Sequence, residues 1–220
     1  ENLRQQAEAL RMLCQIDVVA GRLSAADERL AALIALQSAE PAENAMGAVV
    51  LAHNKKIVGT LYNQLGQYDK AALHLLEALR LQRALKSQQA EGRVLNLLGE
   101  TARLRGNTRA AIPLYEQALS VADTVGDLQG ALYYRTNLGV ALTELGQYET
   151  AVSELEKVVT RVSDISRVVR WLGLLRVQAY LALAFIGLNR LEEAERMPLQ
   201  AYRLSQMRNN DLLSGLAWRV

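Results

Sequence analysis

Few side chains in this sequence are of the types that carry out catalysis or hold a metal. The 220 residues include two histidines, His53 and His74, and one cysteine, Cys14. A catalytic centre or metal site needs several such groups at metal-ligand or hydrogen-bond spacing, and the sequence contains no such cluster. Its glycines recur at long intervals rather than in a phosphate-binding GxGxxG or GxxxxGK[ST] loop. We therefore expect no enzymatic activity, no cofactor and no metal.

The remaining candidate groups have structural explanations. Cys14 occupies a position expected to lie in the core, where a thiol is inert. Glu192 and Glu193 are expected to begin a helix, where their negative charge suits the helix dipole. A general-acid role for these two carboxylates is therefore not expected.

The charge balance excludes several classes of partner. Lys and Arg number 25 and Asp and Glu 23, a net charge of +2 with no basic block that could follow a phosphate backbone. The longest uncharged apolar stretch, 177–188, is shorter than the roughly 20 residues that span a bilayer. We expect binding to neither nucleic acid nor membrane. A single cysteine fits a reducing compartment, so the cytoplasm is the expected location. The chain begins at Glu1 without a signal peptide, which favours a piece of a longer protein.

The composition favours helices. Leu and Ala together make up about one third of the chain, and only three residues are Pro, so good helix formers dominate. The residues expected between successive helices recur with a period near forty residues. The anchor residues of the repeat are Gly21, Gly66, Gly106, Gly146 and Asn189. Seven residues before each anchor is a small residue: Cys14, Gly59, Gly99, Gly139 or Ala182. Five residues after each anchor is an alanine: Ala26, Ala71, Ala111, Ala151 or Ala194.

These columns predict pairs of closely packed helices. Small residues on both helices allow the two backbones to approach, and larger apolar residues fill the grooves between ridges. Gly or Asn at the anchor fits a left-handed helix C-cap. We predict first helices at about 3–20, 44–65, 88–105, 127–145 and 166–187. Second helices are predicted at about 24–37, 68–86, 108–125, 148–162 and 191–207, and an eleventh helix begins near Asp211.

At these residues the sequence resembles the tetratricopeptide repeat (TPR) family. The clearest copy runs from Asn137-Leu138-Gly139 through Leu145-Gly146-Gln147-Tyr148 to Ala151. The usual period is 34 residues, and the longer period here is similar to arrays in MalT-like activators, bacterial signalling ATPases and LGN-type adaptors. The resemblance implies one all-α domain over 1–220, a right-handed superhelix of about five helix pairs. Its repeats would be 3–37, 44–86, 88–125, 127–162 and 166–207, with a partial helix at 211–220.

Three departures leave alternatives open. Asp17 stands where other copies have Tyr62 and Phe185, so the first repeat is either irregular or covered by something else. Pro198 falls inside a predicted helix, and we favour a kink there over a helix that begins at the proline. Apolar residues near the C-terminus indicate either a boundary within a longer array or a dimerisation surface. These residues are Leu212, Leu213, Leu216 and Trp218.

The resemblance implies that first helices line a concave groove, so their polar residues opposite the small-residue column are candidates for partner binding. In the first helix these are Glu8, Arg11 and Gln15. In later repeats the candidates are His53, Lys56, Asn63, Arg93, Asn96, Arg103, Tyr133, Asn137 and Arg176. Asn can hydrogen-bond a peptide backbone, and Arg and Lys can pair with carboxylates. The alternative is that these side chains form a solvated face.

Two functions remain open at this point. The first is a non-catalytic scaffold, within a larger regulatory or signalling protein, that binds a protein, a peptide or another domain of the same chain. The alternative is the small-molecule sensor arm of a MalT-like transcriptional regulator. Its stacking surfaces would be Tyr133, Tyr134, Trp171 and Tyr180, unless these fill repeat interfaces. The carboxylate clamp of some TPR proteins is not matched, because its columns hold Lys56, Thr60, Leu97, Tyr133 and Asn137. We therefore do not expect a chaperone C-terminal peptide as ligand.

Overall fold

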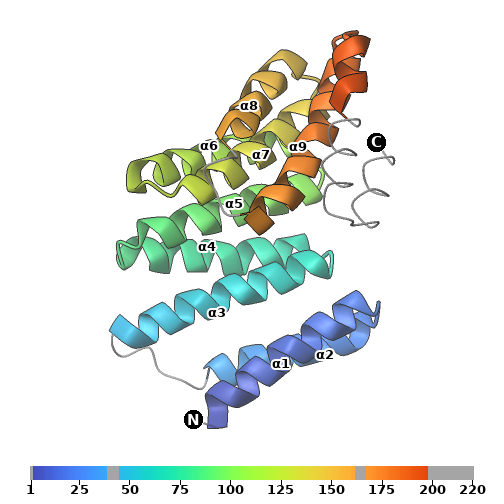
Figure 1. Ribbon diagram of the computed structural model, residues 1–220. Helices are drawn as coiled ribbons and strands as arrows, with labels where there is room; N and C mark the ends of the chain where they lie inside the picture. The colour runs from blue at the N-terminus through green and yellow to red at the C-terminus, as the bar shows by residue number, and fades with distance from the viewer. Residues whose placement is uncertain (1, 39–44, 162–166, 198–220) are drawn as a thin grey trace. The chain divides into compact units, whose positions relative to one another are not determined.

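A computed structural model of the chain describes residues 2–38, 45–161 and 167–197, and these are helical apart from short turns. Contacts divide the chain into two compact units, residues 1–107 and 108–220, which we describe separately. The helices of the first unit are α1 (Asn2–Val19), α2 (Leu23–Ser38), α3 (Ala45–Gln64), α4 (Tyr68–Ala84) and α5 (Gln88–Leu104). Figure 1 shows α1 with α2 and α3 with α4 as antiparallel pairs within the first unit.

The second unit continues the same pattern. Its described helices are α6 (Thr108–Val125), α7 (Leu128–Glu144), α8 (Tyr148–Arg161) and α9 (Arg167–Gly187), followed by a helical segment at 191–197. Within the described residues, the predicted helices are confirmed with boundaries that differ by at most two residues. The kink at Pro198 and the apolar residues from Leu212 to Trp218 lie outside the described residues. The prediction that 1–220 forms one domain stays a prediction.

Each helix pair is closed by the same turn at its anchor residue. At Gly66 the backbone has φ +72°, and the N–H groups of Gly66 and Gln67 donate to the carbonyls of Asn63 and Tyr62 at 3.1 and 2.9 Å. This is the Schellman pattern, in which a left-handed residue satisfies the last carbonyls of a helix. The predicted left-handed conformation is confirmed at all five anchors, including Asn189 with φ +59°.

The two described turns between successive pairs also contain a left-handed residue, which the sequence analysis did not predict. Lys86 follows α4 with φ +54°, and Gly126 follows α6 with φ +71°. The Lys86 N–H donates to the Arg83 carbonyl at 3.0 Å. A left-handed backbone is costly for a residue with a side chain. Lys86 therefore holds a conformation that glycine would adopt more easily.

The small-residue column lies where the two helices of a pair touch. A Cβ atom built on Gly59 would lie 2.6 Å from Leu75 Cγ, and one built on Gly139 would lie 2.5 Å from Leu155 Cγ. Leu75 and Leu155 are fully buried on the second helices α4 and α8. The predicted reason for the small residues is therefore confirmed at these two glycines, because any larger residue would force the helices apart.

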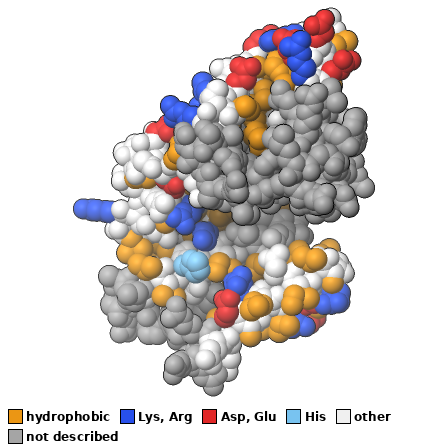
Figure 2. Space-filling view, viewed as in Figure 1, with side chains coloured by type: hydrophobic (Ala, Val, Ile, Leu, Met, Phe, Trp, Pro, Cys, Tyr) orange, Lys and Arg blue, Asp and Glu red, His pale blue; other side chains and the backbone are white. Residues whose placement is uncertain are grey.

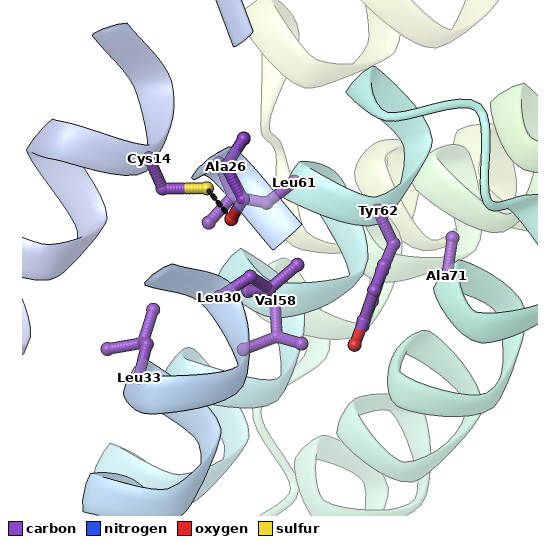
Figure 3. Packing of buried hydrophobic residues seen from close by; sticks show 8 residues of the cluster. All are labelled: Cys14, Ala26, Leu30, Leu33, Val58, Leu61, Tyr62 and Ala71. Carbon is purple, nitrogen blue, oxygen red and sulfur yellow. Dashed lines mark hydrogen bonds between the residues drawn. The ribbon is translucent and has the colours of Figure 1, made fainter. Parts of the chain in front are cut away.

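The first pair is regular, and its core joins that of the next pair. Figure 3 shows Cys14 facing α2, with its Sγ directed to the carbonyl of Ala26 at 3.4 Å. Burial raises the pKa of this thiol, in keeping with the inert role predicted for it. The cluster contains Cys14, Ala26, Leu30 and Leu33 from the first pair and Val58, Leu61, Tyr62 and Ala71 from the second.

Asp17 does not make the first repeat irregular. Its carboxylate is 2% exposed and pairs with Arg22 at 2.7 Å and with Arg29 at 2.5 Å. Hydrogen bonding to Arg22 is the main cause that lowers the pKa of Asp17. Two arginines therefore satisfy a charge at the position where the second and fifth repeats place an aromatic ring.

The contact at Gly139 can be tested by adding one methyl group. We expect Gly139→Ala to lower the free energy of unfolding by about 1–3 kcal/mol, because the new Cβ would overlap Leu155. The matched control is Gly173→Ala in α9, where no described atom lies within 4 Å of the new Cβ. That variant should be neutral or up to about 1 kcal/mol more stable, because Ala favours helix. Urea unfolding followed by circular dichroism measures both, and equal effects would contradict the packing role.

The left-handed turn at Lys86 gives a stabilising substitution. We expect Lys86→Gly to raise the free energy of unfolding by about 1 kcal/mol, because the strain of a side chain at φ +54° is removed. The reciprocal variant Gly126→Ala should lower it by a similar amount. The denaturant midpoints of both variants measure these changes. A loss of stability in Lys86→Gly would contradict the conclusion that this turn favours a glycine.

Candidate functional site

The first helices of the first unit contact one another, α1 with α3 and α3 with α5. Four basic side chains on them, Arg11, His53, Lys56 and Arg93, lie near one another, because Arg11 and Lys56 lower the pKa of His53 and Arg93 lowers that of Lys56. We call these four side chains the cationic face. Figure 2 shows a histidine on the viewed side of the molecule among basic and acidic side chains. His53 and Arg93 are exposed, whereas Arg11 and Lys56 are half-buried.

Three charged side chains, those of Lys56, Arg11 and Glu8, act on His53. Burial is the main cause that lowers the pKa of His53, and the positive charges of Lys56 and Arg11 lower it further, while Glu8 opposes them. Arg11 and Glu8 form an ion pair one turn apart on α1, with Arg11 Nε donating to Glu8 Oε2 at 3.0 Å. His53 therefore lies between a paired arginine on α1 and a lysine one turn further along α3.

Lys56 carries a half-buried charge without an ion-pair partner among the described residues. Burial and the neighbouring Arg93 both lower the pKa of Lys56. The adjacent Lys55 pairs with Glu77 of α4 at 2.7 Å. One of two successive lysines thus joins the helices of its own pair, and the other has no ion pair among the described residues.

The asparagines predicted to line the groove are not open. Asn63, Asn96 and Asn137 are 9%, 2% and 2% exposed, so the expectation that they present their side chains to a partner is wrong. Asn63 Nδ2 donates to Thr101 Oγ1 at 2.8 Å and thereby joins α3 to α5. At Asn63, the neighbouring first helix α5 covers a part of α3 that the small-residue column left open.

The other predicted positions are open to different degrees. Arg103 of α5 is half-buried, ten residues along from Arg93. In the second unit, Tyr133 of α7 is 48% exposed and contacts the buried Tyr134 edge to face, with the ring centres 6.2 Å apart. Arg176 of α9 is half-buried. Their binding role stays a prediction.

The second unit also has a pocket that the sequence analysis missed. It has a volume of about 620 Å³ and lies between α6, α7 and α8. Arg135 Nη1 of α7 pairs with Glu154 Oε2 of α8 at 2.5 Å in its wall. No motif marked these residues, because three separate helices contribute them. The lining residues are Glu116, Leu119, Ser120, Asp123, Thr124, Arg135, Leu138 and Glu154.

The part of the chain that the structure describes contains no cluster of His, Cys, Asp or Glu that could hold a metal ion. The two histidines are on different helices, as expected: His74 of α4 stacks on Tyr62 of α3, with ring centres 5.5 Å apart. A search of the described helices for one long and apolar enough to cross a membrane found none.

Comparisons with known proteins agree with the repeat. Two family models, each described as tetratricopeptide repeat, match residues 48–124 and 131–162. The putative kinesin light chain repeats of Podospora anserina share 21% identity, with 94% of this chain and 96% of theirs covered and a TM-score of 0.72. A search of the curated proteins found no match.

Two similar structures are longer proteins. A signal transduction ATPase of Pyrococcus horikoshii with a tetratricopeptide repeat sensor gives a TM-score of 0.73 at 19% identity, covering 96% of this chain and 31% of that one. The Rap conjugation gene regulator of plasmid pLS20, solved with the Phr* peptide, gives 0.69 at 13% identity, covering 93% and 54%. At these identities the likeness shows the helical-repeat fold.

Neighbouring lysines allow the electrostatics of the cationic face to be tested directly. We expect Lys56→Met to raise the pKa of His53, because a nearby positive charge is removed. Lys55→Met should instead raise the pKa of His74, whose pKa Lys55 lowers. NMR titration of the two imidazoles in both variants measures this, and each variant serves as the control for the other. If Lys56→Met left the pKa of His53 unchanged, the two groups would not share a face.

Proposed function

Because the chain belongs to the tetratricopeptide repeat family, we propose that it is a non-catalytic scaffold that binds a polypeptide segment on its cationic face. The proposal rests on the cationic face, whose side chains come from the three neighbouring first helices α1, α3 and α5. These side chains remain available to a partner, because His53 and Arg93 are exposed and Lys56 has no ion-pair partner among the described residues.

The chemistry of the described residues supports a non-catalytic role. Catalysis requires a nucleophile or base with a group that orients it. Cys14 is fully buried with a raised pKa, and His74 is stacked on Tyr62. His53 is surrounded by charges but has no nucleophile among the groups that act on it. Binding is therefore the activity that these side chains can support.

The similar proteins support a peptide ligand and a place in a larger regulator. The Rap regulator was solved with a peptide, and the Pyrococcus horikoshii ATPase carries its repeats as a sensor within a chain of which this sequence covers 31%. By analogy, we propose that this chain serves as the partner-binding part of a regulatory or signalling protein in the cytoplasm. The partner is a separate protein, a peptide or another domain of the same chain.

A small-molecule sensor arm is the second candidate. The pocket between α6, α7 and α8 favours it, because its volume of about 620 Å³ lies within the range of ligand sites. Its wall is polar, with the Arg135–Glu154 ion pair as a possible recognition element for a hydroxylated or charged ligand. Tyr134, one of the residues expected to stack on a ligand, is buried, and this weakens the sensor candidate.

The location of binding can be tested without assuming a particular partner. Peptides are selected from a random 12-residue library on the protein, and a photo-crosslinking residue, p-benzoylphenylalanine, replaces either His53 or Leu73. We expect selected peptides to crosslink from position 53, on the cationic face. They should not crosslink from position 73, where the leucine is 69% exposed on the second helix α4.

Mass spectrometry of the crosslinked peptides identifies the attachment point. Crosslinking from position 73 alone, or selected peptides that crosslink from neither position, would contradict binding on the cationic face. A sugar or nucleotide that raised the melting temperature, with no peptide selected, would favour the sensor instead.

A further inference from the structure

The unpaired charges of the cationic face point to a particular class of partner. We infer that Lys56 and Arg93 bind carboxylate side chains within an acidic segment of a polypeptide, not its C-terminal carboxylate. This inference rests on the proposed scaffold function and adds the chemistry of the partner to it. It requires that the two cations be available in the free protein and close enough for one segment to reach both.

Availability follows from the pattern of ion pairs in the first unit. Two basic residues near these two in sequence are paired: Lys55 with Glu77 at 2.7 Å and Arg83 with Glu91 at 2.7 Å. Lys56 and Arg93 have no ion pair among the described residues. Arg80 and Lys86 also lack one, but they lie in α4 and directly after it, outside the cationic face. The sequence therefore provides carboxylates for the cations that join helices and none for these two.

The free protein holds Lys56 in an unfavourable electrostatic environment. Its ammonium is half-buried, and the like charge of Arg93 acts on it. A carboxylate placed between them would replace lost hydration with charge-assisted hydrogen bonds and would screen the repulsion. His53 adds a further positive charge when protonated, although Glu8 and Arg11 beside it largely offset each other.

The positions of the two cations suit an extended segment that crosses the first helices. Lys56 lies on α3 and Arg93 on α5, and these helices contact each other. Packed helices lie about 8–10 Å apart, whereas side chains two residues apart on one edge of an extended chain are separated by roughly 7 Å. Acidic residues two or three positions apart could therefore each reach one cation.

Nucleic acid fits this face less well than an acidic polypeptide. Binding to a phosphate backbone with useful affinity commonly involves about six to ten contacts. The cationic face supplies four basic groups, of which Arg11 is already paired with Glu8. Glu100 follows Arg93 two turns further along α5 and adds negative charge to the same helix. The local charge thus suits a few carboxylates rather than a continuous phosphate backbone.

The experiment uses defined peptides and measures fluorescence anisotropy at low ionic strength. The probe is a fluorescein-labelled, C-terminally amidated 12-residue peptide with Glu at alternate positions and Ser between them, and its counterpart has Gln in place of Glu. We expect the Glu peptide to bind at least tenfold more tightly than the Gln peptide. Lys56→Met and Arg93→Met should each weaken binding of the Glu peptide about tenfold.

Lys55→Met is the matched control, because it removes the same charge at the neighbouring residue. We expect it to change the affinity for the Glu peptide by less than twofold. Combining Lys56→Met with single Glu→Gln changes in the peptide should give effects that are not additive, since the two groups interact directly. Lys56→Met should not lower the melting temperature, because no described partner loses its ion pair.

Several results would overturn the inference. Equal binding of the Glu and Gln peptides, or equal losses in Lys55→Met and Lys56→Met, would show that the face does not recognise carboxylates. Tighter binding of a 12-nucleotide oligothymidine with the same variant dependence would indicate nucleic acid instead. Selected library peptides that crosslink at position 53 but are not enriched in Asp and Glu would reject the acidic segment while leaving the scaffold function intact.

Discussion

The close approach of the two helices in each pair is the constraint on which the other features depend. At Gly59 and Gly139 the absence of a side chain lets Leu75 and Leu155 of the opposite helix reach the backbone. This contact fixes which side of a first helix is buried against its partner. Because a helix repeats every 3.6 residues, fixing that side also fixes which residues stay outside the contact, including the exposed His53.

The helices and turns could be predicted from sequence because their determinants are local. Glycine or asparagine at the anchor favours the left-handed cap, and the apolar period defines each helix over fewer than twenty residues. Lys86 shows the limit of this reasoning, since it adopts the same left-handed conformation with a residue type that does not favour it. Its turn is closed by backbone hydrogen bonds, from the Lys86 and Ser87 N–H groups to the carbonyls of Arg83 and Gln82, which any residue type can make.

The candidate site could be predicted only in part, because burial depends on neighbours far away in sequence. The basic residues His53, Lys56 and Arg93 lie on accessible parts of their helices. Asn63 does not, since it bonds to Thr101, 38 residues further along the chain. A helical period shows which residues share a side of one helix, but not how much of that side the next helix covers.

The distribution of ion pairs follows from the same geometry. Lys55 pairs with Glu77 between α3 and α4, and Arg135 pairs with Glu154 between α7 and α8, so each pair joins a first helix to its own second helix. Lys56, the next residue along α3, has no carboxylate partner among the described residues, so a carboxylate that neutralises it must come from elsewhere. The packing that defines the repeat thereby separates basic residues that hold the fold together from one that is available to a partner.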